Sequence, residues 1–194
     1  GTGSCPDVEN SFVVTINALP SAPVTTDVSY CVGDVAAPIT SSVTATGTLT
    51  WYSDAAGTIV IAEPTIDTSV ASSTTYYVSQ TDTNTCESGV SSISVTVNSI
   101  PVIATTQTPL TGCDTDDGII TVSGGGATGV VNWSGPVSGS SGSVTLPYDI
   151  TGLEPGTYDV TFTDDATGCT SAAEQESFVN PGAPVIDPIA DYES

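Results

Sequence analysis

The residues of this sequence with the clearest chemistry are five regularly spaced cysteines: Cys5, Cys31, Cys86, Cys113 and Cys169. The intervals from Cys5 to Cys86, from Cys31 to Cys113 and from Cys86 to Cys169 are nearly equal. Regular cysteine spacing indicates disulfide chemistry in an oxidising compartment. The two cysteines of one repeat are separated by almost the same length of chain as those of the next, which predicts the pairs Cys31–Cys86 and Cys113–Cys169 and leaves Cys5 unpaired in this chain. The alternative is five reduced structural thiols.

A turn rich in carboxylates is the next candidate for chemistry. It reads Asp114-Thr115-Asp116-Asp117-Gly118, so Asp114, Asp116 and Asp117 are candidate calcium ligands, because hard cations prefer oxygen donors. The turn lacks the spacing of a calcium loop with its distal Glu, and Asp and Gly are also ordinary turn formers. Calcium binding and simple turn formation are both left open, and no other cofactor is expected.

Three aromatic residues are candidates for a glycan-binding platform: Trp51, Tyr52 and Trp133. The two tryptophans follow the first cysteine of their repeats, Cys31 and Cys113, at the same distance along the chain. A tryptophan at a matched position in two repeats is more typical of a hydrophobic core than of a binding surface. The platform and the core remain alternative interpretations.

The composition argues against catalysis. The 194 residues include 22 Asp and Glu but no Lys, Arg or His, which gives a net charge of −22. Without His or Lys there is no ordinary catalytic triad and no Schiff base, and we expect no enzyme. Such a charge repels nucleic acid and anionic membranes, and no apolar stretch is long enough to insert as a transmembrane helix.

The segment Cys86–Pro101 matches Cys5–Pro20 without a gap. Apolar residues alternate in both, as in Ile93, Val95 and Val97, which is the pattern of a strand with one buried face. The proline ends the strand because it cannot donate to a ladder. The segment therefore predicts the last strand of a repeated β domain, followed by a linker.

Short alternating segments separated by Gly, Pro and Asp turns fill the remaining chain, and no helix is expected. The predicted strands include 49–52, 74–81, 117–122, 130–133, 143–150 and 157–162, and residues 136–143 are expected to form a flexible loop. This pattern is typical of β-sandwiches. We predict an all-β fold of tandem domains, each with one disulfide.

The repeat spacing predicts the domain boundaries. Residues 1–19 are interpreted as the final strand of a preceding repeat, 20–99 and 100–182 as two β-sandwiches, and 183–194 as the start of the next repeat. The same spacing predicts another cysteine just after Ser194, within a longer array. The strand in 1–19 is expected to pair with its own domain or with an adjacent molecule by strand addition.

Two motifs resemble a known family. Leu49-Thr50-Trp51-Tyr52, together with Thr74–Gln80, resembles the Ig-like domains common in secreted proteins of Bacteroidota. Ile150–Tyr158, followed by Thr163–Cys169, resembles the repeats of giant gliding-motility adhesins of the SprB type. The resemblance implies a very long extracellular protein of the cell surface, exported by the type IX secretion system. Antibody-type domains have a Tyr two residues before the second Cys.

In this sequence Tyr77 and Tyr158 lie further upstream of the second cysteine of their repeats than the Tyr of an antibody-type domain does. We therefore expect each disulfide to tie the start of a domain to its last hairpin. The leading functional prediction is a structural segment of a stalk or fibre, whose partners are neighbouring repeats and identical chains. The alternatives are an adhesive module that binds glycans or surfaces, and a spacer in a secreted hydrolase.

Overall fold

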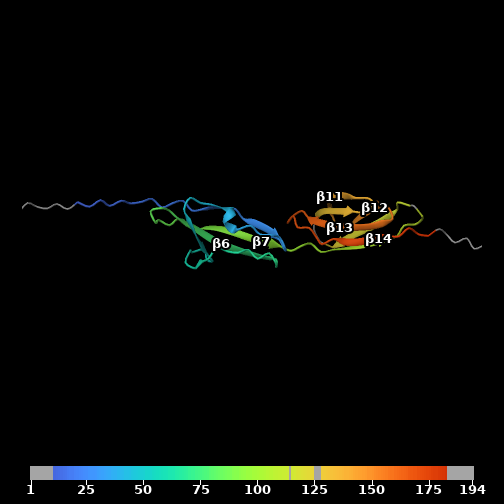
Figure 1. The fold of residues 1–194 in the computed structure, drawn as a ribbon, viewed down its shortest axis with the longest axis horizontal. Helices are drawn as coiled ribbons and strands as arrows, with labels where there is room; N and C mark the ends of the chain where they lie inside the picture. Colours follow the sequence, from blue (N-terminus) through green and yellow to red (C-terminus); the bar gives the residue numbers. More distant parts are fainter. Residues whose placement is uncertain (1–10, 114, 125–127, 183–194) are drawn as a thin grey trace, which may run out of the picture. The chain divides into compact units, whose positions relative to one another are not determined.

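A computed structural model describes residues 11–113, 115–124 and 128–182, which form an all-β structure (Figure 1). One short 3₁₀ helix, η1 (Ile39–Ser42), interrupts the strands. No helix within these ranges is long and apolar enough to cross a membrane. The chain divides into two compact units: the first contains residues up to 28, 37–66 and 73–95, and the second contains 29–36, 67–72 and those from 96 onward.

The N-terminal half of the described chain builds two sheets. The larger has the order β2-β7-β6-β4-β5, and the smaller pairs β1 with β3. The strands are β1 (Val24–Thr25), β2 (Val28–Cys31), β3 (Val43–Thr44), β4 (Thr48–Tyr52), β5 (Val60–Ile61), β6 (Ser72–Thr81) and β7 (Ser91–Asn98).

Strand β7 forms as its alternation predicts. Ile93, Val95 and Val97 are at most 4 % exposed, while the residues between them are not buried. Burying one face of a strand removes its apolar side chains from water, which contributes roughly 1.5–3 kcal/mol for each large residue. Trp51 and Val78, which pair across β4 and β6, are buried in the same half of the chain. The sequence period therefore determines which face of this sheet is apolar.

The second unit contains a three-stranded and a four-stranded antiparallel sheet, with the orders β12-β9-β8 and β11-β10-β13-β14. Strands β11 to β14 are labelled in Figure 1. The strands are β8 (Ile103–Thr108), β9 (Gly118–Gly124), β10 (Thr128–Ser134), β11 (Gly139–Thr145), β12 (Tyr148–Leu153), β13 (Gly156–Asp164) and β14 (Glu174–Phe178).

One hydrophobic cluster joins these two sheets. Ile120, Val122 and Ile150 come from the three-stranded sheet, while Phe162 and Phe178 come from the four-stranded one. All five are less than 5 % exposed. Two sheets that share one apolar core form a β-sandwich, so the second unit has the predicted architecture.

Two local predictions are wrong. The expected loop at 136–143 contains strand β11, and the strand expected at 143–150 is divided between β11 and β12, which are separated by a cis Leu146–Pro147 bond. Residues 11–19 belong to no strand, and Phe12 and Ile16 are 85 % and 91 % exposed. Their interpretation as the last strand of a preceding repeat stays a prediction, because such a strand needs the other strands of its sheet.

Candidate functional site

In the described part of the chain, a disulfide joins Cys31 to Cys169, with a sequence separation of 138 and a Cα–Cα distance of 5.6 Å. Both cysteines lie in the second compact unit, although they belong to different sequence repeats. Cys86 and Cys113 are free thiols. The predicted pairs Cys31–Cys86 and Cys113–Cys169 are therefore wrong, and so is the expectation of one disulfide within each repeat.

Strand β7 explains why Cys31 and Cys86 do not pair. Cys31 lies beside the end of β7, since the next residue, Val32, donates its N–H to the Asn98 carbonyl at 2.9 Å. Cys86 precedes the start of β7 at Ser91. Eight residues of extended strand span roughly 25 Å, whereas disulfide-bonded Cα atoms lie within about 7 Å.

The second repeat has the same arrangement. Cys169 precedes strand β14, which begins at Glu174. The Sγ of Cys113 lies 2.7 Å from the Pro181 carbonyl oxygen, beyond the end of β14 at Phe178. Each repeat therefore carries one cysteine before its last strand and one beside the end of that strand. We call these the hairpin cysteine (Cys86, Cys169) and the exit cysteine (Cys31, Cys113).

The two hairpin cysteines lie in loops with matching hydrogen bonds. The Asp82 N–H donates to the Cys86 carbonyl at 3.1 Å, and the Asp164 N–H donates to the Cys169 carbonyl at 3.0 Å. Each Sγ lies 3.9 Å from the carbonyl oxygen two residues earlier. Cys169 is fully buried, whereas Cys86 is only partly buried. The two loops therefore present their sulfurs in the same local geometry.

A buried serine closes each loop. Ser88 donates its N–H to the Gln80 carbonyl at 2.9 Å, and its Oγ accepts the Gln80 N–H at 3.0 Å. Ser171 does the same with Phe162, at 2.8 Å and 3.0 Å. Because buried polar groups cost free energy unless they are paired, these bonds hold the chain in place two residues after each hairpin cysteine.

The residue facing each serine differs between the repeats. In the second repeat it is Phe162, fully buried in the core. In the first it is Gln80, 3 % exposed, whose Oε1 accepts the N–H groups of Thr46 and Gly47 at 2.7 and 2.8 Å. Its Nε2 donates to the Ser21 carbonyl at 2.7 Å. Gln80 thus fixes the chain that leads into the first repeat by hydrogen bonds.

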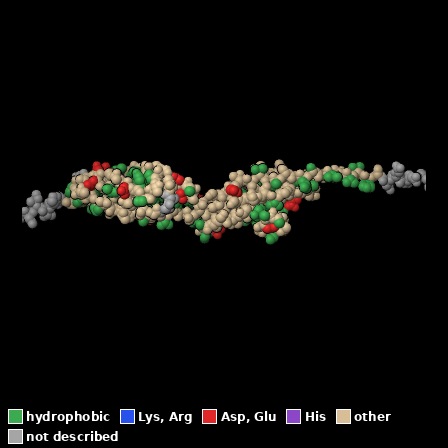
Figure 2. All heavy atoms as spheres, turned by 180° about the vertical axis from the view of Figure 1, so that it is seen from behind, with side chains coloured by type: hydrophobic (Ala, Val, Ile, Leu, Met, Phe, Trp, Pro, Cys, Tyr) green, Lys and Arg blue, Asp and Glu red, His purple; other side chains and the backbone are tan. Residues whose placement is uncertain are grey.

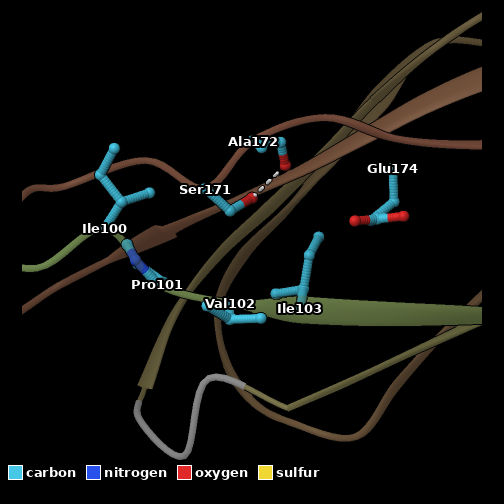
Figure 3. A pocket seen from close by; sticks show the side chains of 7 residues that line it. All are labelled: Ile100, Pro101, Val102, Ile103, Ser171, Ala172 and Glu174. Carbon is cyan, nitrogen blue, oxygen red and sulfur yellow. Dashed lines mark hydrogen bonds between the residues drawn. The ribbon is translucent and has the colours of Figure 1, made fainter. Parts of the chain in front are cut away.

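In the second unit, the chain that leads into the repeat lies against the hairpin loop. A cavity of about 150 Å³ is lined by Ile100, Pro101, Val102, Ile103, Ser171, Ala172 and Glu174. Figure 3 shows the apolar side chains of 100–103 on one segment, and Ser171 and Ala172 on the other. The lining offers one carboxylate and one hydroxyl, and the Ser171 Oγ already donates to the Ala172 carbonyl at 2.8 Å.

A cluster of polar side chains lies next to Cys86. The Ser79 hydroxyl donates to the Glu87 carboxylate at 2.5 Å, and the Tyr52 hydroxyl donates to the same carboxylate. These two bonds lower the pKa of Glu87 below its usual value. Burial, followed by the hydrogen bond to Glu87, raises the pKa of Tyr52. Glu87 is therefore held in its charged form beside the hairpin cysteine.

The aromatic platform is contradicted at two of its three residues. Trp51 and Tyr52 are each 4 % exposed, so they belong to the core of the first repeat. Trp133 is partly buried against the core of the second unit, where its indole lies over Gly139 of β11. A Cβ added to Gly139 would lie 2.4 Å from the Trp133 ring. The core interpretation is thus the correct one for Trp51 and Tyr52.

The calcium prediction falls partly outside the described residues, because Asp114 is not among them. Asp117 accepts hydrogen bonds from the Thr111 N–H and from the hydroxyls of Thr111 and Thr115, which lower its pKa. Asp116 lies in the same turn. Within the described ranges no three His, Cys, Asp or Glu side chains form a metal-binding group. Calcium binding stays a prediction, and the bonds of Asp117 are those of a turn.

The surface carries no cationic side chain, because the sequence has none. Figure 2 shows the acidic side chains scattered among polar and apolar ones on the face that it displays. Asp54 is typical, since N–H and hydroxyl donors of its own turn, mainly Ile59, lower its pKa. Some of these carboxylates accept hydrogen bonds within their own turns, as Asp54 does, and others accept from distant residues, as Glu63 does from Thr40.

Comparison with known proteins adds a family. Residues 20–101 match the family model described as an Ig-like domain, CHU_C associated. This segment is therefore similar to an Ig-like domain. A solved structure of fibronectin(III)-like modules of CbhA from Clostridium thermocellum is 16 % identical, covering 79 % of this chain and 89 % of its own, with a TM-score of 0.44. The search of curated proteins found no match.

The serines and aspartates of the hairpin loops are not among the residues predicted from the sequence. Their signal is present, because Ser follows each hairpin cysteine by two positions, and Asp precedes it by four or five. The sequence carries no comparable signal for which cysteine bonds to which, because several possible pairings have equal spacing. An alignment of the two repeats therefore finds the loops but not the bond.

Proposed function

We propose that this chain is a structural spacer segment of an extracellular cell-surface protein. In this role the Cys31–Cys169 disulfide transmits tension past most of the folded chain. That disulfide is the single observation that carries the proposal. The Ig-like match of residues 20–101 supports it, because it agrees with a module used as a spacer. The finer role that we propose is a stalk or fibre of an adhesin.

The mechanical argument follows from chain connectivity. A force applied to the two ends of the chain reaches Cys31 and Cys169, and there it passes through the sulfur–sulfur bond. The intervening residues, including strands β3 to β13, lie in a closed covalent loop of sequence separation 138. They can unfold, but they cannot lengthen the chain while the bond is intact. Such a segment limits the extension of a stalk under load.

The charge supports an extracellular spacer. With 22 acidic and no basic residues, neighbouring segments repel one another and nucleic acid. The screening length is about 8 Å at physiological salt, so this repulsion acts mainly at short range. It keeps an exposed stalk soluble and discourages lateral association. The lack of Lys and Arg also removes every site for trypsin-like proteases.

An adhesive module is the weaker alternative. Two residues of its aromatic platform, Trp51 and Tyr52, are buried in the core. The carboxylates of Asp54 and Asp117 accept hydrogen bonds within their own turns. A glycan array probed with the oxidised chain separates the two functions. Selective binding that Trp133→Ala abolishes without unfolding the protein would favour the adhesive module over the spacer.

Single-molecule stretching tests the spacer. The oxidised chain, pulled from its termini, is expected to show no extension from residues between Cys31 and Cys169. The double variant Cys31→Ser/Cys169→Ser is expected to gain up to about 480 Å of contour length from this segment, at roughly 3.5 Å per residue. Cys86→Ser is the matched control and should behave as the parent. An oxidised parent that extends as far as the double variant would contradict the proposal.

A further inference from the structure

Each repeat ends in a strand with one cysteine near each of its ends, and the observed bond joins unlike kinds. Cys31 is an exit cysteine and Cys169 is a hairpin cysteine. Among the described residues, the two remaining cysteines are Cys86, a hairpin cysteine, and Cys113, an exit cysteine, and both are free thiols. The described part of the chain therefore retains one unpaired cysteine of each kind.

We propose that Cys86 and Cys113 are complementary halves of a second bond of the same type, formed with another repeat of this kind. In the isolated chain that repeat is supplied by a second copy, so that Cys113 of one molecule bonds to Cys86 of the next, head to tail. This inference goes beyond the spacer function, because it names the partner and the residues that bind it.

The geometry of Cys86 supports this assignment. Its loop reproduces that of the bonded Cys169, with the same Asp N–H bond at 3.1 against 3.0 Å. The Sγ-to-carbonyl distance is 3.9 Å in both loops, and the Oγ of the following serine donates to the next carbonyl at 2.8 Å in both. Cys86 thus has the closing hydrogen bonds of its bonded counterpart, in a loop that is one residue shorter, without having a bond.

The position of Cys113 gives independent support. Its Sγ is exposed and lies beside the Pro181 carbonyl, just after the last strand of the second repeat. Cys31 occupies the corresponding place, beside the end of β7 at Asn98, and there it is bonded. An exposed exit thiol and a preformed hairpin thiol are the two components that the observed disulfide combines.

Pairing unlike ends has a definite consequence for assembly. Contact between two different surface patches joins molecules head to tail, which generates a ring where the rotation between copies closes and an open chain where it does not. Every added copy again presents one exit and one hairpin cysteine. The expected products are oligomers joined by unlike cysteines, either open or closed into rings.

The bond requires an oxidant, which we take to be a small disulfide such as oxidised glutathione. The Cys113 thiolate attacks a glutathione sulfur and releases one glutathione, and the Cys86 thiolate of the next molecule then displaces the second glutathione. Two protein thiols are oxidised to one disulfide, one oxidised glutathione is reduced to two thiols, and the two protons are transferred to them.

Two single-thiol proteins test the pairing. Both carry Cys5→Ser and keep the Cys31–Cys169 bond; one also carries Cys113→Ser and the other Cys86→Ser. Each is equilibrated alone, and then as an equal mixture, in a glutathione redox buffer at about 0.15 M salt, which screens repulsion between the acidic chains. Digestion with Asp-N and Glu-C together places Cys86 and Cys113 in separate peptides, 82–87 and 88–113.

The mixture is expected to contain the 82–87/88–113 cross-link at about ten times the level of either like-with-like cross-link. Each protein alone should stay largely monomeric. Random pairing would give only a twofold excess of the unlike product, and that ratio would overturn the proposal. Absence of any cross-link under conditions that re-form Cys31–Cys169 in the same reduced sample would overturn it as well. Neither result alters the stretching test of the spacer.

Discussion

The two hairpin loops share the same closing hydrogen bonds, although the second is one residue longer and only it contains a bonded cysteine. The loop at 82–88 has a free Cys86, while the loop at 164–171 has Cys169 joined to Cys31. The backbone hydrogen bonds of the two loops are nearly equal in length, at 3.1 and 2.9 Å in the first and 3.0 and 2.8 Å in the second. The bond is therefore not what shapes the loop. Aspartate and serine shape it, and the disulfide adds a connection to a loop that is already formed.

The largest expected difference between the two loops lies in the residue that faces the serine. Phe162→Ala is expected to destabilise the second unit by about 3–5 kcal/mol, because it removes a fully buried ring. Gln80→Ala is expected to cost about 1–3 kcal/mol, because it leaves the N–H groups of Thr46 and Gly47 without their acceptor. Urea denaturation, followed by tryptophan fluorescence, measures both.

This prediction has an internal control. Gln80→Glu preserves an acceptor for Thr46 and Gly47 but loses the donor to Ser21. Because it also buries a charge that no cation compensates, it should cost at least as much as Gln80→Ala at neutral pH. Equal losses for Gln80→Ala and Phe162→Ala would show that the loops are held by the same forces, and our comparison would then fail.

The next largest difference between the loops is expected from replacing their cysteines by serine. Cys31→Ser/Cys169→Ser is expected to lower the free energy of unfolding by about 2–4 kcal/mol, because the unfolded chain is no longer constrained by a long covalent loop. Cys86→Ser/Cys113→Ser removes two thiols without a bond and should stay within about 0.5 kcal/mol of the parent. Both pairs are measured under identical non-reducing conditions, and equal effects would contradict the assigned bond.

The sequence predicts the strands well where side chains alternate. Ile93, Val95 and Val97 occupy the predicted face of β7 because burial of every second residue leaves a direct pattern. The sequence does not predict strand β11, because its residues are mostly Gly and Ser. Gly139 is required there by the Trp133 indole, which leaves no room for a Cβ. That constraint comes from a neighbouring strand and leaves no local periodicity.

The disulfide partners show the same limit. Cysteine spacing predicts a repeat, and the hairpin position of Cys169 agrees with the expectation that a disulfide ties into the last hairpin. The spacing does not show that β7 separates Cys31 from Cys86 by its full length. A pairing depends on distances through space, and equal intervals along the chain are compatible with bonds within one repeat or between two.

A smaller and equal effect is expected at the serines. Ser88→Ala and Ser171→Ala each remove a buried hydroxyl that accepts a backbone N–H at 3.0 Å. Each should destabilise its unit by about 1–2 kcal/mol, since a backbone donor loses its partner. Hydrogen exchange of the Gln80 and Phe162 amides reports the loss directly. An effect confined to Ser88 would indicate that the disulfide, and not the serine, holds the second loop.

The smallest expected difference depends on pH and belongs to the first loop alone. Glu87 has a lowered pKa because the hydroxyls of Ser79 and Tyr52 donate to its carboxylate, while the second loop has Thr170 at the matching β-bridge position. A carboxyl group with a lowered folded-state pKa contributes stability above its unfolded pKa of about 4.3. That contribution is lost as the pH falls through the folded-state value.

Between about pH 5 and pH 3 the parent should therefore lose more stability in the first unit than Glu87→Gln does, and Trp51 fluorescence during thermal unfolding, in a Trp133→Phe background, follows it. Parallel pH profiles for the two proteins would show that the hydroxyls do not favour the charged form of Glu87.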